Sequence, residues 1–223
     1  MTFPVSNGAL VTDLLAAPYL IKVCAVTSVH DAQLVADAGA SALGVIFAAS
    51  PRRVSLETAS EVCLSVSGRL GRVGVFRHTR YEDVARAVEA VELDAVQIHG
   101  GVPEGVATLA RDRGLALIEA LSVGDLDAAS GEAGAYLVDG PHPGSGETHD
   151  WSEVAARTWD RPLIVAGGLT GESVAGVLAR VSAWGCDIAS GSESAPGVKD
   201  RERVESFVRN ARAYFDSREE QRG

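Results

Sequence analysis

Short apolar runs alternate with amphipathic helical stretches along most of the chain, and this alternation restricts its possible folds more than any other feature. From Leu20 onward there are eight such runs, each rich in valine, isoleucine and leucine. Runs of this kind are typical of parallel strands that are covered on both faces. We expect strands at residues 20–24, 42–47, 72–76, 95–98, 116–120, 135–138, 162–166 and 186–189.

Helical stretches separate these runs. Residue patterns typical of a helix N-terminus begin at Ser28, Thr79 and Asp150. The segment 123–129 has room only for a short helix. Longer helices are expected at 29–38, 56–66, 80–91, 103–113, 152–158, 171–182 and 201–215. Such an alternation of strands and helices leaves two main architectures, a closed barrel and a doubly wound open sheet.

The position of the glycine-rich turns favours the barrel. An open dinucleotide-binding sheet usually carries a G-x-G-x-x-G turn after its first strand, whereas here the first run leads into Cys24-Ala-Val-Thr27. The glycine-rich turns follow the seventh and eighth runs, where barrels frequently bind phosphate. We therefore predict an α/β fold, a single-domain (β/α)8 TIM barrel at residues 20–215, with an N-terminal extension at 1–19 and a charged tail at 216–223.

Composition and charge narrow the range of partners. A net charge of −10 argues against binding to nucleic acids or anionic membranes, although a pocket with local positive groups can still hold an anionic substrate. The first residues do not resemble a signal peptide, and no apolar run is long enough to span a membrane. The three cysteines are widely spaced, so we expect no disulfide framework, no metal site and a cytoplasmic location.

The carboxyl ends of the strands select the candidate catalytic residues, because active sites form there in this fold. Cys24 ends the first strand and can act as a base or nucleophile once ionised, although a buried cysteine is more often a packing residue. Cys63 and Cys186 fit packing positions better. Asp139 ends the sixth strand, where it is either a general acid with a raised pKa or the start of an Asx turn.

Other residues at the same end of the barrel are suited to binding. The backbone N–H groups of Gly167, Gly168, Ser190 and Gly191 can approach a phosphate. Arg52 can clamp a substrate carboxylate, whereas a solvated surface position remains open for it or for Arg53. His99 either lines the pocket or caps its strand. We expect the site to need no cofactor.

Several of these segments carry a family resemblance in barrel order. They are Lys22-Val-Cys-Ala-Val-Thr27, Ala38-Gly-Ala-Ser-Ala-Leu-Gly44, Ser50-Pro-Arg-Arg-Val-Ser55, Val73-Gly-Val-Phe76, Leu93-Asp-Ala-Val-Gln-Ile-His-Gly100, and Val165-Ala-Gly-Gly-Leu169 together with residues 187–200. Together they resemble phosphoribosylanthranilate isomerase, a family of tryptophan biosynthesis. The resemblance covers about residues 20–209 and implies a monomer or homodimer that acts on a phosphorylated sugar.

The resemblance implies an Amadori rearrangement, which converts N-(5-phosphoribosyl)anthranilate to 1-(2-carboxyphenylamino)-1-deoxyribulose 5-phosphate without a cofactor. Asp139 would protonate the ribose ring oxygen, and Cys24 would remove the proton from C2. Arg52 would hold the anthranilate carboxylate, and the two glycine turns would hold the phosphate.

Four positions depart from the family pattern. Ala25 replaces a glycine, and its methyl group would crowd the pocket or restrict the backbone. Glu147 stands near a common lysine, Ser192 replaces a valine, and Arg77 begins a stretch that adds positive charge. Two alternatives therefore stay open: a paralogue that isomerises a related aminosugar phosphate in secondary metabolism, and a barrel that binds a phosphate ligand without catalysis.

Overall fold

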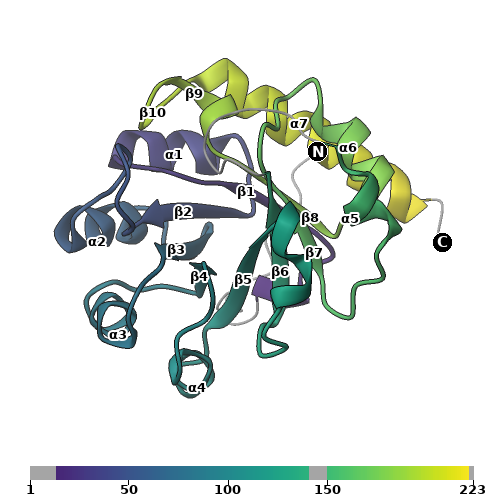
Figure 1. Ribbon diagram of the computed structural model, residues 1–223. Helices are drawn as coiled ribbons and strands as arrows, with labels where there is room; N and C mark the ends of the chain where they lie inside the picture. Colours follow the sequence, from purple (N-terminus) through teal and green to yellow (C-terminus); the bar gives the residue numbers. More distant parts are fainter. Residues whose placement is uncertain (1–13, 141–149, 221–223) are drawn as a thin grey trace.

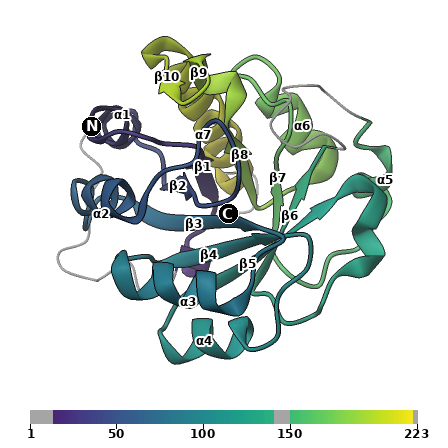
Figure 2. The same ribbon diagram turned by 60° about the vertical axis from the view of Figure 1, so that its left-hand side comes forward.

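The centre of the molecule is a closed barrel of eight parallel strands (Figures 1 and 2). A computed structural model describes residues 14–140 and 150–220. Neighbouring strands pair in sequence order, and β8 pairs with β1 to close the ring. The (β/α)8 prediction is therefore confirmed. The first and last residues of every predicted strand lie within two residues of the observed bounds. The strands are β1 Leu20–Val23, β2 Ala42–Ile46, β3 Gly71–Arg77, β4 Ala95–His99, β5 Ala116–Ser122, β6 Ala135–Asp139, β7 Leu163–Val165 and β8 Gly185–Ile188.

Helices surround this barrel and cover the outer faces of its strands (Figure 2). The α-helices are α1 Val29–Asp37, α2 Leu56–Leu64, α3 Tyr81–Ala90, α4 Val106–Asp112, α5 Ser152–Ala156, α6 Val174–Val181 and α7 Arg201–Glu220. Short 3-10 helices are η1 Leu14–Ala16, η2 Val123–Ala128 and η3 Ser190–Ser192. None of the helices in the described ranges is long and apolar enough to cross a membrane.

Side chains accept hydrogen bonds from first-turn N–H groups at two of the three expected helix starts. The Ser28 side chain accepts a hydrogen bond from the Asp31 N–H at 3.1 Å and so caps α1. At the start of α5, the Asp150 side chain accepts a hydrogen bond from the Ser152 N–H at 3.0 Å. The prediction at Thr79 is wrong by one residue, because Arg80 precedes the first helical residue of α3 and forms no side-chain cap. The Thr79 hydroxyl instead donates to the carbonyl oxygen of Arg80.

Strand alternation divides the buried apolar side chains into two layers. Side chains such as Ile21 and Val23 point outward and pack with the helices, whereas Leu20 and Cys24 point into the barrel. Leu14 of η1 joins the inner layer and is only 4% exposed. The Trp184 indole N–H donates to the Ala17 carbonyl oxygen at 3.1 Å. Residues 14–17 are therefore docked on the barrel, below the strands' N-terminal ends.

The C-terminal helix continues beyond the expected end at residue 215. Tyr19 stacks on Phe215, and its hydroxyl donates to Asp216 at 3.2 Å. Arg218 donates to the Ala183 carbonyl oxygen at 3.2 Å. These contacts hold the last turns of α7 against the barrel, so residues 216–220 of the expected charged tail belong to the helix.

Candidate active site

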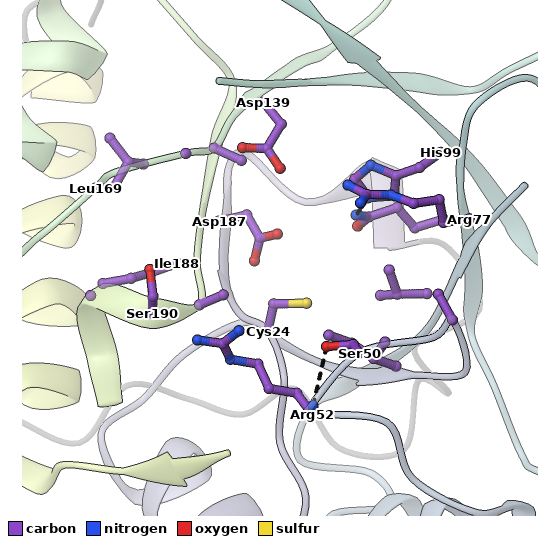
Figure 3. Close-up of a pocket in the computed structure, with 18 of the residues that line it drawn as sticks. Cys24, Ser50, Arg52, Arg77, His99, Asp139, Leu169, Asp187, Ile188 and Ser190 are labelled. Atoms are coloured by element: carbon purple, nitrogen blue, oxygen red, sulfur yellow. Dashed lines mark hydrogen bonds between the residues drawn. The ribbon is translucent and has the colours of Figure 1, made fainter. Parts of the chain in front are cut away.

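A cavity of about 280 Å³ opens at the carboxyl ends of the barrel strands (Figure 3). The strand ends and the loops that follow them supply its walls. All eight residues expected at the site lie on these walls: Cys24, Arg52, His99, Asp139, Gly167, Gly168, Ser190 and Gly191. The strand-end argument therefore brought together residues that are far apart in the sequence.

Cys24 lies in the middle of the cavity floor, next to a buried ion pair (Figure 3). The side chain of Lys22 is fully buried, and its ammonium group donates to Asp187 Oδ2 at 2.8 Å. Lys22 and Asp187 are paired in register on β1 and β8. Burial raises the pKa of the Cys24 thiol, and the Lys22 ammonium opposes that rise. The lysine therefore favours the thiolate.

The close approach of these groups depends on a glycine in the next strand. A Cβ atom at Gly44 would lie 2.8 Å from Cys24 Sγ and 3.2 Å from Lys22 Nζ. Distances this short are repulsive, so residue 44 must lack a side chain for both groups to keep their places. The same residue sits in one of the segments that carry the family resemblance.

Asp139 lies at the end of β6 and is only 8% exposed. Its Oδ1 atom accepts a hydrogen bond from the Gly140 N–H at 2.9 Å. Burial and the nearby Asp187 carboxylate raise the pKa of Asp139 to about 6. A carboxyl group with such a pKa is partly protonated near neutral pH, as a general acid requires. Of the loop that follows, residues 141–149 lie outside the described residues, and Glu147 is among them.

The two glycine turns form the opposite wall from His99 (Figure 3). Gly167 has a φ of +87°, and a Cβ atom there would lie 2.5 Å from Asp139 Oδ1. A Cβ atom at Gly191 would overlap the carbonyl oxygen of Leu169. Both positions therefore require glycine, and the backbone of this wall is open to close approach by an anionic group.

Arg52 is held by an acidic partner that the sequence did not reveal. Its Nε atom donates to Glu193 Oε2 at 2.9 Å, and its Nη2 atom donates to the same oxygen at 2.8 Å. Glu193 is buried and also accepts from Lys199 Nζ, at 3.3 Å. Ser192, at the position of a usual valine, accepts a further bond from Lys199 at 3.0 Å. The guanidinium group of Arg52 is thus fixed at the wall, with Nη1 left for a ligand.

This acidic partner lies on a small hairpin that was not predicted. Strands β9 (Glu193–Ala195) and β10 (Val198–Lys199) pair antiparallel between η3 and α7. The hairpin contains polar and glycine residues and resembles an ordinary surface loop in sequence. In the sequence, the importance of this hairpin was indicated only by the family resemblance, which extends through residues 187–200.

His99 and Arg77 form the far side of the cavity (Figure 3). The His99 Nε2 atom lies 2.9 Å from the Gln97 side-chain nitrogen. Burial lowers the pKa of His99 to about 3, with a further contribution from the charge of Arg77, so the imidazole is neutral. His99 therefore lines the pocket, which is one of the two alternatives that the sequence left open for it. Arg77 ends β3, and its guanidinium group makes no ion pair or hydrogen bond with the other described residues.

The backbone at Ala25 confirms the expected restriction. Its φ is +62°, in the left-handed region that favours glycine, and the residue is completely buried. An L-residue in this conformation is strained by contact between its Cβ atom and the backbone. The position directly follows Cys24, so the strain lies next to the cavity floor.

Comparisons with known proteins agree with this geometry. A family model described as N-(5'phosphoribosyl)anthranilate (PRA) isomerase matches residues 21–210. A protein of Rubrobacter xylanophilus named N-(5'-phosphoribosyl)anthranilate isomerase is 40% identical over 204 residues, which cover 86% of this chain and 98% of the relative.

The chain is also similar to solved structures of isomerases with this name. The phosphoribosyl anthranilate isomerase of Thermotoga maritima is 31% identical, with a TM-score of 0.79 over 87% of this chain and 99% of its own. A second isomerase structure is 30% identical, with a TM-score of 0.76 over 87% of this chain and 99% of its own. That protein is in complex with reduced 1-(o-carboxyphenylamino)-1-deoxyribulose 5-phosphate.

Proposed function

The chain belongs to the N-(5'-phosphoribosyl)anthranilate isomerase family, and we propose that Asp139 and Cys24 are the acid and the base of its reaction. It is an isomerase of tryptophan biosynthesis. The observation that supports the two roles is the placement of a carboxyl group of raised pKa and a thiol beside an ammonium group on one cavity.

Asp139 performs the first step as a general acid. It donates its proton to the ring oxygen of the ribose, and the bond between that oxygen and C1 breaks. The lone pair of the amine nitrogen forms the C=N bond of a Schiff base as the ring opens. A pKa of about 6 leaves a useful fraction of Asp139 protonated at neutral pH.

Cys24 performs the second step as a general base. Its thiolate takes the proton from C2, and the electron pair of that C–H bond forms a C1=C2 double bond. The C=N electron pair moves back to nitrogen and gives an enolamine. The enolamine becomes the ketone when the C2 hydroxyl loses its proton and C1 gains one. The nearby ammonium group of Lys22 supports the thiolate in this step.

The remaining wall residues bind the substrate. The backbone at Gly167, Gly168, Ser190 and Gly191 approaches the phosphate, because Gly167 and Gly191 carry no side chain where the anion must come close. Arg52 contacts the anthranilate carboxylate through Nη1. The neutral His99 packs against the aromatic part of the substrate. The three cysteines are free, buried thiols, which fits an enzyme of a reducing cytoplasm.

Turnover of N-(5'-phosphoribosyl)anthranilate, followed by its fluorescence, tests this proposal. We expect the purified chain to be active and the Cys24→Ser variant to be inactive. If the folded chain has no activity, the substrate is a related aminosugar phosphate instead. If the variant retains full activity, Cys24 is not the base. Binding of the reduced product analogue without turnover would favour a barrel that binds without catalysis.

A further inference from the structure

We infer that Lys199 is a positioning residue for the binding of the substrate carboxylate. It balances the negative charge of Glu193, so that Arg52 keeps its own positive charge for that carboxylate. This inference rests on the proposed function, in which Arg52 contacts the anthranilate carboxylate. Lys199 is not among the residues that line the cavity. It therefore acts on the substrate only through Glu193 and Arg52.

The first observation is where the chain places its lysines. It contains eighteen arginines but only two lysines, Lys22 and Lys199. The side chains of both lysines are 0% exposed. Lysine is almost never fully buried unless it is paired, and both have an acidic partner: Asp187 for Lys22 and Glu193 for Lys199. The chain therefore uses an ammonium group only where a compact charge is held inside the protein.

Three acceptors surround the buried ammonium group of Lys199. Its Nζ atom donates to Ser192 Oγ at 3.0 Å, to Glu193 Oε1 at 3.3 Å and to the Ala189 carbonyl oxygen at 3.4 Å. Three acceptors match the three N–H groups of a charged lysine. Ser192 donates its own proton to the Ala189 carbonyl oxygen at 2.7 Å, so its hydroxyl oxygen is free to accept. The usual valine would lack this acceptor, so the departure at Ser192 helps to hold the charge.

The β9–β10 hairpin fixes the distance between the two charges. Lys199 and Glu193 are paired across its strands. The backbone N–H of Lys199 donates to Oδ2 of the buried Asp31 at 3.2 Å. The Thr27 hydroxyl donates to the carbonyl oxygen of Gly197, in the turn of the hairpin, at 2.6 Å. Because the hairpin is anchored at both places, the ammonium group stays beside Glu193.

The charges around Arg52 show why such a balance is needed. The Nε–H group and one N–H group of Nη2 donate to Glu193, which leaves three of the five guanidinium N–H groups for a ligand. A substrate carboxylate bound there is also repelled by the nearby Glu193 carboxylate. Arg52 and Glu193 alone are neutral together, whereas the two cations with Glu193 carry a net charge of +1. Lys199 thereby leaves this wall attractive to an anion.

The experiment compares two ligands on matched variants. The first ligand is reduced 1-(o-carboxyphenylamino)-1-deoxyribulose 5-phosphate, and the second is the same compound with hydrogen in place of its carboxyl group. Calorimetry measures both dissociation constants for the parent chain, Lys199→Met, Lys199→Gln and the double variant Lys199→Met/Glu193→Gln. Glutamine at residue 199 removes the charge but keeps two N–H donors. Arg209→Met is the control for the loss of one positive charge, because Arg209 is exposed on α7 and lies outside the cavity.

We expect the parent and Arg209→Met to bind the carboxylated ligand about 10- to 100-fold more tightly than the other, as a charge-assisted contact predicts. Both single variants of Lys199 should lose about 10-fold of this preference, because Glu193 then cancels the charge of Arg52. Their affinity for the ligand without a carboxyl group should equal that of the parent. The double variant again carries a net charge of +1, so its preference should return to within about threefold of the parent's.

Two results overturn the inference. If the single variants keep the parent's preference, the charge of Lys199 does not reach the substrate carboxylate. If the double variant stays as poor as the single ones, Lys199 maintains the shape of the hairpin and not the charge of Arg52. Should Lys199→Met fail to fold, Lys199→Gln supplies the same comparison. A parent chain that binds neither ligand, or binds both equally, instead contradicts the proposed function, so the two failures are distinguishable.

Discussion

Replacing Asp139 by asparagine should stabilise the fold at neutral pH while it removes activity. The change keeps the shape of the side chain, and the amide oxygen of asparagine can still accept the hydrogen bond from the Gly140 N–H. It removes only the ability to ionise. Because Asp139 is buried beside Asp187, its ionised form destabilises the folded chain, and asparagine has no such form.

The size of the effect follows from the pKa of Asp139. That pKa is about 6 in the folded chain, against the ordinary value of 3.8, and such a difference corresponds to about 3 kcal/mol. The folded state holds the proton more tightly, so stability falls as the pH rises from 3.8 to about 6. Below this interval Asp139 is neutral in both states, and above it the full destabilisation applies.

Urea unfolding of the parent and of Asp139→Asn at about pH 4 and about pH 8 measures this difference. We expect nearly equal stabilities at the lower pH. At the higher pH the variant should be more stable by up to about 3 kcal/mol. Asp112→Asn controls for the loss of one negative charge, because Asp112 is exposed on α4. Identical pH dependence in the parent and Asp139→Asn would refute the argument from burial.

Three further predictions concern the base, the pH profile and the strained backbone. Cys24→Ser should lower kcat by about 100-fold or more while it retains the product analogue, because a serine hydroxyl is a far weaker base; steady-state rates and calorimetry measure both, and full activity would exclude the base. Above about pH 6 the thiolate becomes more abundant as protonated Asp139 becomes scarcer, so log kcat/KM should rise to about pH 6 and then level off. A rise that continues through neutral pH would show that Asp139 is not the acid. Ala25→Gly should raise stability by about 0.5–1 kcal/mol, because it relieves a positive φ; an unchanged melting temperature would mean that no strain is stored there.

Most of the barrel could be predicted from the sequence because its strands are covered on both faces. Each strand is therefore a short run of valine, isoleucine and leucine, and the polar break after it marks the carboxyl end. Cys24 and Asp139 were found because they stand at such ends. The position of a strand end decides which side chains meet, so eight residues could be assigned to one cavity before any distance was known.

The buried charges of the site were harder to predict. Lys22 lies in the first apolar run, and a lysine is usually expected to reach solvent. The alternation of side chains along the strand places Leu20, Lys22 and Cys24 on the same inner face, so the sequence did contain a signal for its burial. Glu193 and Lys199 gave no such signal, because their burial depends on how the β9–β10 hairpin folds over Arg52.

In the proposed mechanism, the Lys22–Asp187 ion pair lets one cavity floor serve both an acid and a base. Its positive end dominates at Cys24, where the effect of Lys22 in lowering the pKa exceeds that of Asp187 in raising it. Its negative end dominates at Asp139, where Asp187 raises the pKa more than Lys22 lowers it. The same pair therefore favours the thiolate of the base and the protonated form of the acid. A buried ion pair often contributes little to stability. In the proposed mechanism this pair has a catalytic role instead, because two apolar residues of the same size would shift neither the pKa of Cys24 nor that of Asp139 in the required direction.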